Sequence, residues 1–299
     1  MRTGPVVVVG AAARDLIISI DQLPEPGGSA AVRESAERLG GKGANIAAAT
    51  RQLLPHSSVS LVAALGADAA GDQAVADALD AGIDVTHVAR RGTTSLLVDV
   101  VEDGGRRRLL ERIALESRVT RRDVRDAEAV IGAAQVVVLQ LQQDAMVLVD
   151  AARVAHEAGA TLVLDGAIES DEARPQLLEM APVVRADAHE AALLTGRAIA
   201  SVDDAQGAAS TLLAAGAELV ALSVPRAGDL VAWNGGSRFY PHHEGEVIDP
   251  TGAGDAFVAG MVAGVVHNED PATIGARAAA AAATAVGQLG GFTRFRPRR

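Results

Sequence analysis

Short apolar runs alternate with alanine-rich helical patterns along almost the whole chain. Val6–Val9 is a run of four valines that ends at Gly10, a pattern typical of a strand buried on both faces of a parallel sheet. Further strands are predicted at Val59–Ala63, Val136–Leu139, Thr161–Leu164 and Leu219–Ser223, with helices at Ala69–Asp80, Asp144–His156 and Asp203–Ala214. This alternation predicts an α/β fold, in which a central, mostly parallel sheet lies between helices.

One segment interrupts the alternation. Ser95–Val101 and Arg107–Glu111 are predicted strands, and the Asp103-Gly104-Gly105 sequence between them is a hairpin signal. A hairpin inserted into an alternating pattern often forms a flap over a site. No low-complexity linker or shift in composition divides the chain, so we expect one domain that carries this flap.

The charge balance limits the partners of the protein. Its 27 Lys and Arg residues against 38 Asp and Glu residues give a net charge of −11, which disfavours nucleic acid and anionic membranes as partners. The absence of cysteine excludes disulfides and thiolate metal sites, and the seven histidines show no metal-ligand spacing. The N-terminus does not resemble a signal peptide, and no apolar stretch approaches ~18–20 residues. We therefore expect a soluble, cytoplasmic protein.

The sequence DPTGAGDAFVAG, residues 249–260, contains a possible anion site. It follows a predicted strand at Gly245–Ile248 and opens a predicted helix, so that the backbone N–H groups of Gly252–Gly254 lie at a helix N-terminus, which favours anions. If the anion is a phosphoryl group in transfer, these donors stabilise its charge, and Asp255 is placed to accept a hydroxyl proton. Taken alone, the motif fits equally well a glycine-rich turn with Asp255 in the first turn of a helix.

The sequence GGKGANIA, residues 40–47, combines glycines with polar donors. Glycine allows the backbone to approach a ligand closely, and Lys42 and Asn45 offer donors to hydroxyl oxygens. A loop that enters a helix holds such donors on one rigid patch, as recognition of a polyhydroxylated ligand requires. Taken alone, the segment also fits a glycine turn, a helix start and a solvated lysine.

The two motifs in this order resemble the signatures of one family. DPTGAGDAFVAG resembles the C-terminal signature of the PfkB family of carbohydrate kinases, and GGKGANIA resembles the N-terminal signature of its ribokinase branch. The resemblance covers nearly the whole chain and implies a ribokinase-like fold, as a single domain over residues 1–299 with a small β lid from about 14–38 and 92–111. It also implies transfer of the γ-phosphate of ATP to a sugar or nucleoside hydroxyl, Mg²⁺ and K⁺ as cofactors, and a homodimer.

The resemblance also assigns roles by position. It implies that Asp255 is the general base, and that Gly252, Ala253 and Gly254 form the anion hole. The substrate-binding residues would be Asp15, Gly41, Lys42, Gly43, Asn45, Gln142 and Asp255. The ATP-binding residues would be Asp187, Glu190, Ser223, Arg226, Gly228 and Gly254, with Glu190 also holding Mg²⁺ through water. The monovalent cation would be held by Asp249, Thr251, Ala285 and Gly290, with a weaker match at Gln288 and Arg294.

Four positions depart from the family pattern. Ala13 and Gln142 stand where ribokinases usually carry Asn and Glu, which alters the sugar contacts and leaves a nucleoside kinase or a phosphosugar kinase as an alternative. Asp187 replaces the Asn of the N-x-x-E motif, and Pro225 replaces a glycine. These two changes leave a non-catalytic sugar- or nucleotide-binding regulator as a further alternative, whereas the intact glycine–aspartate motif favours an enzyme. Asp187 and Glu190 also fit a capped helix start, and both roles are compatible.

Overall fold

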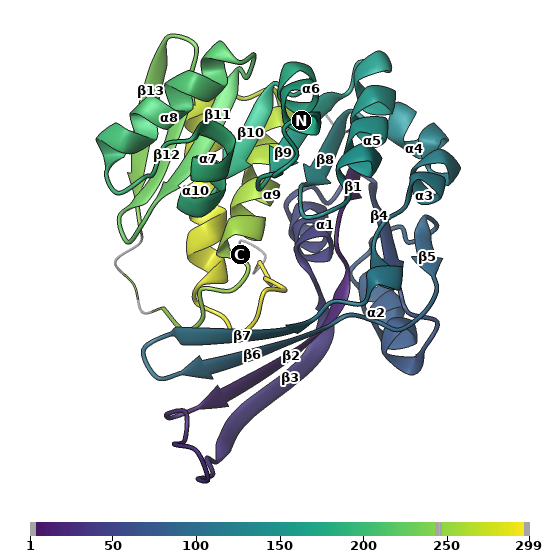
Figure 1. The fold of residues 1–299 in the computed structure, drawn as a ribbon, viewed down its shortest axis with the longest axis vertical. Helices are drawn as coiled ribbons and strands as arrows, with labels where there is room; N and C mark the ends of the chain where they lie inside the picture. The colour runs from purple at the N-terminus through teal and green to yellow at the C-terminus, as the bar shows by residue number, and fades with distance from the viewer. Residues whose placement is uncertain (1–3, 243–244, 246, 296–299) are drawn as a thin grey trace.

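The computed structural model describes residues 4–242, 245 and 247–295, which form a large sheet, a small sheet and the helices around them (Figure 1). The large sheet has nine strands in the order β13-β12-β11-β10-β9-β8-β1-β4-β5. The strands from β11 to β5 run parallel, and β12 and β13 are antiparallel additions at one edge. The strands are β1 (Val6–Val9), β4 (Val59–Leu65), β5 (Val88–Arg90), β8 (Val136–Gln140), β9 (Thr161–Asp165), β10 (Val183–Ala186), β11 (Leu219–Val224), β12 (Gly228–Trp233) and β13 (Gly236–Pro241).

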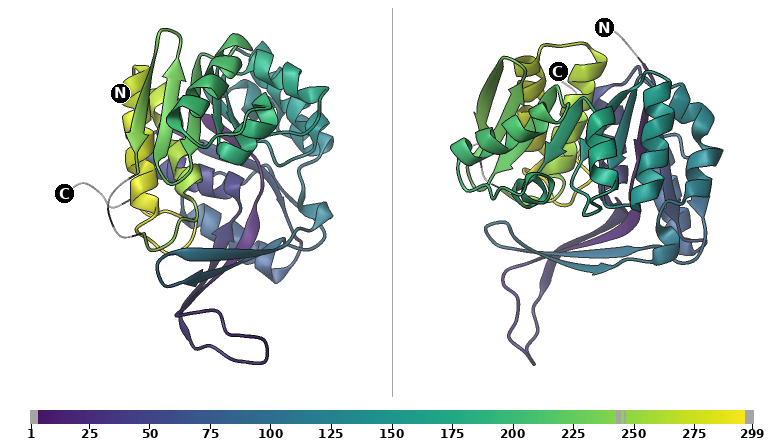
Figure 2. Two further views of the ribbon diagram at one scale, coloured as in Figure 1. Left: turned by 60° about the vertical axis from the view of Figure 1, so that its left-hand side comes forward. Right: turned by 45° about the horizontal axis from the view of Figure 1, so that its top comes forward.

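Both faces of the large sheet are buried under helices (Figure 2). Within β1, Val7 and Val9 belong to the apolar core on one face, whereas Val6 and Val8 belong to the core on the other. One layer contains α3 (Arg121–Asp126), α4 (Glu128–Gly132), α5 (Ala145–Glu157), α6 (Ala173–Met180), α7 (Ala188–Thr195) and α8 (Val202–Ala214). The other contains α1 (Lys42–Leu53), α2 (Ala69–Asp80), α9 (Ala253–Val266) and α10 (Pro271–Ala285). The predicted α/β architecture is therefore confirmed. Within the described part of the chain, no helix combines the length and apolar character needed to cross a membrane.

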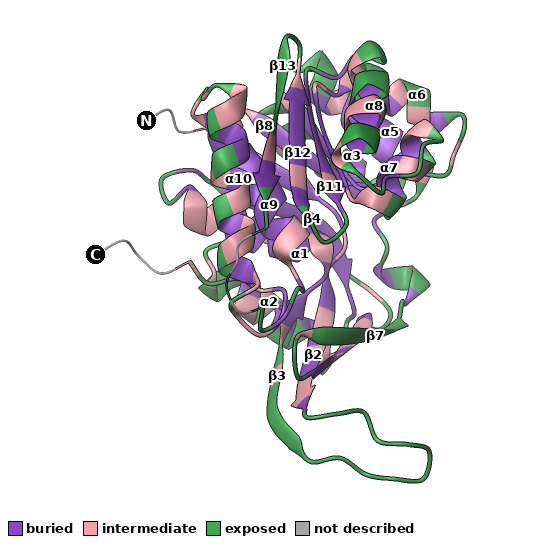
Figure 3. Ribbon diagram, turned by 90° about the vertical axis from the view of Figure 1, so that its left-hand side faces the viewer, coloured by how far each residue is buried: buried purple, intermediate pink, exposed green. Residues whose placement is uncertain are grey.

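The small sheet lies across one end of the large sheet (Figures 1 and 2). Its order is β3-β2-β6-β7, with bounds Ala13–Ile20 for β2, Val32–Gly40 for β3, Leu96–Glu102 for β6 and Arg106–Arg112 for β7. The strand β2 follows directly after the carboxyl end of β1, so the small sheet starts where the parallel strands end. Most of β3 and β7 is exposed to solvent (Figure 3). The separate small sheet implied by the family resemblance is present.

Two segments near the C-terminal half of the large sheet differ from the sequence expectation: one predicted strand does not form, and one edge strand was not predicted. The predicted strand at Gly245–Ile248 is wrong: residue 246 lies outside the described residues, and its described neighbours form no strand. The N–H of Ile248 instead donates to the carbonyl of Val286 at 2.9 Å, and Val247 and Ile248 remain 40% and 46% exposed. Conversely, the edge strand β13 carries little apolar signal because most of its residues are exposed, and the sequence analysis missed it.

Candidate functional site

A cavity of about 510 Å³ lies between the carboxyl edge of the large sheet and the small sheet. Both sequence motifs line it, through Gly41, Lys42, Asn45, Gly252, Gly254 and Asp255. The small sheet contributes Asp15, Asp99 and Arg107, and the segments after β8 and β10 contribute Gln142 and Asp187. A larger cavity of about 1450 Å³ between α1, α10 and the C-terminal segment contains no residue of either motif. The smaller cavity is therefore the candidate functional site.

The helix α9 begins at the cavity with a bare N-terminus. Its N-cap, Gly252, has a φ of 77° and makes no side-chain capping hydrogen bond. A Cβ at this position would lie 2.4 Å from the carbonyl oxygen of Gly291, so only glycine fits. Because no side chain covers this helix end, its first N–H groups and the helix dipole are available to an anion in the cavity.

Asp255 joins the two motifs. Its carboxylate accepts a hydrogen bond from Nδ2 of Asn45 at 3.0 Å, although the two residues are 210 positions apart in sequence. Burial raises the pKa of Asp255 to about 6, and the neighbouring Lys42 opposes that shift. The side chain is therefore ionised at neutral pH and is a better proton acceptor than an ordinary carboxylate.

Two buried acceptors beside Asp255 have no donor. Oδ1 of Asp15 and Oδ1 of Asn45 are both buried and have no hydrogen-bond partner among the described residues. Burial, followed by the charges of Asp99 and Asp255, raises the pKa of Asp15 to about 7. Since buried polar atoms are normally paired, these two oxygens indicate a ligand that carries hydroxyl donors.

Four charged side chains form a buried network behind the cavity. Nζ of Lys42 contacts Oε1 of Glu190 at 3.0 Å, and Nη1 of Arg185 donates to Oδ1 of Asp165 at 3.1 Å. Arg185 also lies 3.8 Å from Glu190, which links the two pairs. Burial lowers the pKa of Lys42, but the carboxylates of Asp165 and Glu190 raise it more, so the lysine stays charged.

The helix α7 begins at the same edge with a capping box. The N–H of Glu190 donates to Oδ1 of Asp187 at 2.8 Å, and the N–H of Asp187 donates to Oε2 of Glu190 at 2.8 Å. The capped helix start expected from these residue types is therefore confirmed. The same capping box positions two carboxylates beside the cavity.

Four of the expected nucleotide-binding residues lie outside the lining of this cavity: Glu190, Ser223, Arg226 and Gly228. Ser223, Arg226 and Gly228 are on the hairpin between β11 and β12, where Oγ of Ser223 donates to Oδ1 of Asp229 at 2.7 Å. Arg226 occupies the turn with a φ of 61° and is exposed. The hairpin therefore lies at the same carboxyl edge of the large sheet, because β11 is the parallel neighbour of β10, the strand that carries Arg185.

The residues expected to hold a monovalent cation cluster around Asp249. This carboxylate is completely buried and accepts hydrogen bonds from the N–H and hydroxyl of Thr251, at 2.8 and 2.5 Å, and from the N–H of Gly290 at 2.8 Å. No basic group lies within ion-pair distance of it in the described residues. Gln288 bonds to the backbone of Arg294 through both ends of its amide, so these two residues shape the adjacent turn.

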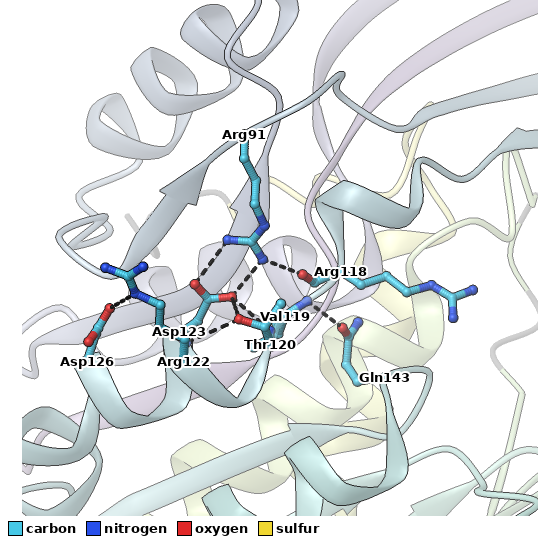
Figure 4. A network of polar contacts seen from close by, with 8 residues as sticks. All are labelled: Arg91, Arg118, Val119, Thr120, Arg122, Asp123, Asp126 and Gln143. Carbon is cyan, nitrogen blue, oxygen red and sulfur yellow. Dashed lines mark hydrogen bonds and ion pairs between the residues drawn. The ribbon is translucent and has the colours of Figure 1, made fainter.

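A network of polar contacts fixes the wall of the cavity next to α3 (Figure 4). The guanidinium of Arg91 binds both carboxylate oxygens of Asp123, at 3.0 and 2.6 Å, and the carbonyl of Arg118. Oε1 of Gln143 accepts from the N–H of Val119 at 3.1 Å. These contacts hold the backbone of Arg118, while its side chain extends away from the network and lines the cavity.

The sequence analysis missed several charged residues of the site. Asp165 and Arg185 end strands that otherwise read as buried apolar runs, and Asp99 and Arg107 form an ion pair on the small sheet. A usable signal was present, because a charged residue at the carboxyl end of an apolar strand lies at the edge where ligands bind in parallel sheets.

Comparisons with known proteins identify the family and the fold of the chain. A sequence model described as the pfkB family carbohydrate kinase matches residues 4–295. The chain is 28% identical over 267 residues to a ribokinase of Haemophilus influenzae, covering 88% of this chain and 85% of that protein. It is 29% identical over 252 residues to an ATP-dependent ribose-1-phosphate kinase of Halopiger xanaduensis, covering 83% and 80%. A solved structure of Arabidopsis thaliana ribokinase complexed with ribose and ATP has a TM-score of 0.79, with 24% identity over 96% of this chain and 94% of that one, and this likeness shows the fold.

We expect Asp15→Asn to stabilise the protein in a pH-dependent way. The pKa of Asp15 is about 7 in the folded protein against 3.8 ordinarily, so between these values the folded state binds more protons than the unfolded state, and stability falls as pH rises. The gain in Tm on replacing Asp15 should therefore be near zero at pH 4, increase towards pH 7 and level off above it, as measured by thermal unfolding. The exposed Asp171→Asn controls for the loss of one charge. A gain that is equal at pH 4 and pH 8 would contradict this account.

We expect Gly252→Ala to lower both stability and any catalytic rate. A left-handed conformation costs a non-glycine residue ~1–2 kcal/mol, and the added Cβ would also press on Gly291. Denaturant unfolding should show at least this loss. The matched control is Gly287→Ala, whose Cβ would meet nothing nearer than 3.7 Å. Equal effects of the two substitutions would rule out a special role for the backbone at residue 252.

Proposed function

This chain belongs to the pfkB family of carbohydrate kinases, and we propose that it is a ribokinase-like enzyme that transfers the γ-phosphate of ATP to a sugar hydroxyl. Membership of the family makes it an ATP-dependent carbohydrate kinase. The observation that carries the finer proposal is the 3.0 Å hydrogen bond between Asn45 and Asp255, because it brings the two motifs together around one cavity. The ribokinase relatives support a pentose as the first substrate class to test.

Asp255 is the proposed general base. It is ionised at neutral pH, and the hydrogen bond from Asn45 holds its carboxylate in place. As the sugar hydroxyl oxygen bonds to the γ-phosphorus, its proton passes to Asp255. The bond between the γ-phosphorus and the β–γ bridging oxygen breaks, and ADP leaves with the electron pair.

The start of α9 is the proposed anion hole. The N–H groups of the segment from Gly252 through Ala253 to Gly254 are aimed at the position where the transferred phosphoryl group develops charge. Because no side chain caps the helix, these donors need no rearrangement at the moment of transfer. Asp255 follows these residues directly in the first turn of α9, so the donors and the proposed base lie at the same end of the helix.

The sugar is proposed to bind between the small sheet and α1. Asp15 and Asn45 offer the unpaired acceptors, Lys42 offers N–H donors, and Gln142 offers an amide at the opposite wall. The glycines on both sides of Lys42 let the start of α1 pack closely on the segment that follows β1, since a Cβ at Gly43 would lie 2.7 Å from the carbonyl carbon of Gly10. Ala13 lines the same cavity and provides no polar contact there.

A phosphorylated sugar is the second candidate substrate. The side chain of Arg118 lines the cavity and forms no ion pair with any residue that the structure describes. Its guanidinium is therefore free to bind a phosphate group by donating hydrogen bonds to it. Arg107 lines the same wall, although it is paired with Asp99. The Halopiger relative named as a ribose-1-phosphate kinase supports this alternative.

ATP is proposed to bind along the edge formed by α7, the β11–β12 hairpin and α9, with Ser223, Arg226 and Gly228 at its outer end. Asp187 and Glu190 offer hard oxygen ligands, which fit Mg²⁺ held chiefly by the phosphates of the nucleotide. The described residues contain no group of three acidic or histidine side chains that would hold a metal without a nucleotide. Mg²⁺, when bound, would offset the charge of the phosphates and of Asp187.

A monovalent cation fits beside Asp249. A completely buried carboxylate without a basic partner is unfavourable unless a cation lies near it. K⁺ is proposed to be held by Asp249 together with Thr251, Ala285 and Gly290. When bound, it would neutralise this charge and stiffen the loop that leads into α9.

The small sheet is proposed to be a lid on a single kinase domain over residues 1–299, formed by segments of about 14–38 and 92–111. Its face away from the cavity presents Leu16, Ile18, Val98 and Val100, which the strand register places side by side, and Leu110, which is 62% exposed. An apolar sheet face of this kind is suited to pack on a second copy. We therefore propose a homodimer in which the two lids pair.

We expect Asp255→Asn to abolish most of the activity. Loss of a positioned general base costs ~10²–10⁴-fold in kcat. The measurement is ADP release with Mg·ATP across ribose, other pentoses, hexoses, sugar phosphates and nucleosides. In the wild type, kcat should fall as pH drops through about 6, because protonated Asp255 cannot accept the hydroxyl proton. The exposed Asp171→Asn variant should keep the wild-type rate.

Two outcomes would count against this proposal. If Asp255→Asn retains the wild-type kcat on the accepted substrate, Asp255 is not the base. If no substrate is phosphorylated while calorimetry still detects sugar or Mg·ATP binding, the chain is a binding protein that has lost turnover, and Asp187 and Pro225 become the positions to examine.

We expect K⁺ to raise kcat when KCl replaces choline chloride at constant ionic strength. Asp249→Asn should remove this activation and lower the affinity for K⁺, because the buried charge that attracts the cation is gone. The thermal stability of the wild type should also rise with KCl and not with choline chloride. A wild-type enzyme that responds equally to both salts would contradict the proposed site.

A further inference from the structure

Arg185 is a buried charged residue near the carboxyl end of a central strand of the large sheet. It lies on β10, where it pairs in register with Asp165 of β9 and Ala221 of β11, and it is only 7% exposed. A guanidinium is costly to bury, so its position requires compensating carboxylates. Asp165 and Glu190 provide them, and although burial opposes it, their charges raise the pKa of Arg185 above its ordinary value. The side chain is therefore a fixed, permanent cation.

The guanidinium lies directly against the start of α9. A Cβ built on Gly254 would be 2.7 Å from Nη2 of Arg185 and 3.0 Å from its Nη1 and Cζ. Only a glycine at residue 254 allows this approach. The positive end of the helix and the arginine cation are thus adjacent, and both line the same cavity.

Most of the donors of this arginine are unused. A guanidinium carries five N–H donors, and the described residues accept one hydrogen bond from it, at Oδ1 of Asp165. Glu190 lies 3.8 Å away, beyond hydrogen-bond distance. Arg185 has spare N–H donors, yet none of its nitrogens is a fully buried atom without a hydrogen-bond partner. Its spare donors are therefore open to the cavity that Arg185 lines. An arginine that served only to neutralise two carboxylates would point its donors at them.

We propose that Arg185 is a further catalytic residue, which donates hydrogen bonds to the non-bridging oxygens of the γ-phosphoryl group while that group passes from ATP to the acceptor hydroxyl. This inference rests on the proposed kinase function. As the new bond from the acceptor oxygen to phosphorus forms and the bond to the ADP oxygen breaks, charge spreads over those oxygens, and the proton goes to Asp255. A planar guanidinium matches these oxygens in shape and charge.

The same inference accounts for Asp187. Arg185 lies on β10 and Asp187 is the N-cap of α7 directly after that strand, and both residues line the cavity. Asp187 adds a negative charge where the family motif has a neutral amide. Arg185 supplies the opposite charge on the same side, so an acidic residue beside the phosphates is tolerated.

The test compares binding of two nucleotides to variants of Arg185 by calorimetry, with Mg²⁺ present. Mg·AMP-PNP carries a γ-phosphoryl group and Mg·ADP does not. The first variant, Arg185→Lys, keeps the charge and loses the planar fork. The second, Asp165→Asn with Arg185→Gln, removes both partners of the buried pair, so that no uncompensated charge threatens folding. Arg174→Lys, on the surface of α6, is the matched control.

We expect both variants to bind Mg·ADP like the wild type and Mg·AMP-PNP at least ~10-fold more weakly, with kcat on any accepted sugar reduced ~100-fold, as for loss of one transition-state donor. Unchanged affinity for both nucleotides, or an equal loss for both, would overturn the role of Arg185. A wild-type protein that binds neither nucleotide would instead overturn the proposed kinase function, and this result is distinct from the other two.

Discussion

The hydrogen bond between Asn45 and Asp255 is the contact on which the rest of the site depends. It exists because α1 packs on α9 through small and apolar residues, among them Ala44, Ala48 and Val258, which bring the two helix starts together. Gly291 is part of this packing, since a Cβ there would lie 2.6 Å from Nδ2 of Asn45. A polar contact over such a long sequence separation can form only after α1 and α9 have packed together on one face of the sheet. The geometry of the candidate site is therefore a consequence of core packing.

Carboxylates with the same chemistry take different roles because their neighbours differ. Asp165 and Glu190 lie beside Arg185 and Lys42, and Lys42 and Arg185 lower the pKa of Glu190 in spite of its burial. Asp15 has no such partner, and burial raises its pKa. The carboxylates with cationic partners hold the positive groups of the site in place. The carboxylate without such a partner keeps a buried oxygen without a hydrogen-bond donor among the described residues.

The sequence predicts the architecture well because strands buried on both faces and helices between them leave a clear pattern. It also identifies the two glycine-rich helix starts, whose backbone requirements exclude other residues. It fails where a contact depends on the fold. The apolar residues Val247 and Ile248 suggest a strand but lie exposed beside α10, and no local pattern shows that Arg185 meets Gly254 or that Asp99 faces Asp15. Such pairs are set by strand order, which local periodicity does not contain.

The charged network also connects the start of α1 to the start of α7 and to the strands β9 and β10. Lys42 is the first residue of α1, whereas Glu190 belongs to the first turn of α7, and a 3.0 Å contact joins Nζ of Lys42 to Oε1 of Glu190. An ammonium group has three donors, so Lys42 keeps two for a ligand while Glu190 fixes its position. Arg185 belongs to the same network, because it lies 3.8 Å from Glu190 and donates a hydrogen bond to Asp165. The charged groups that hold the candidate site together thus include Lys42 and Arg185, which line the cavity, so removing either one would affect both the shape and the charge of the site.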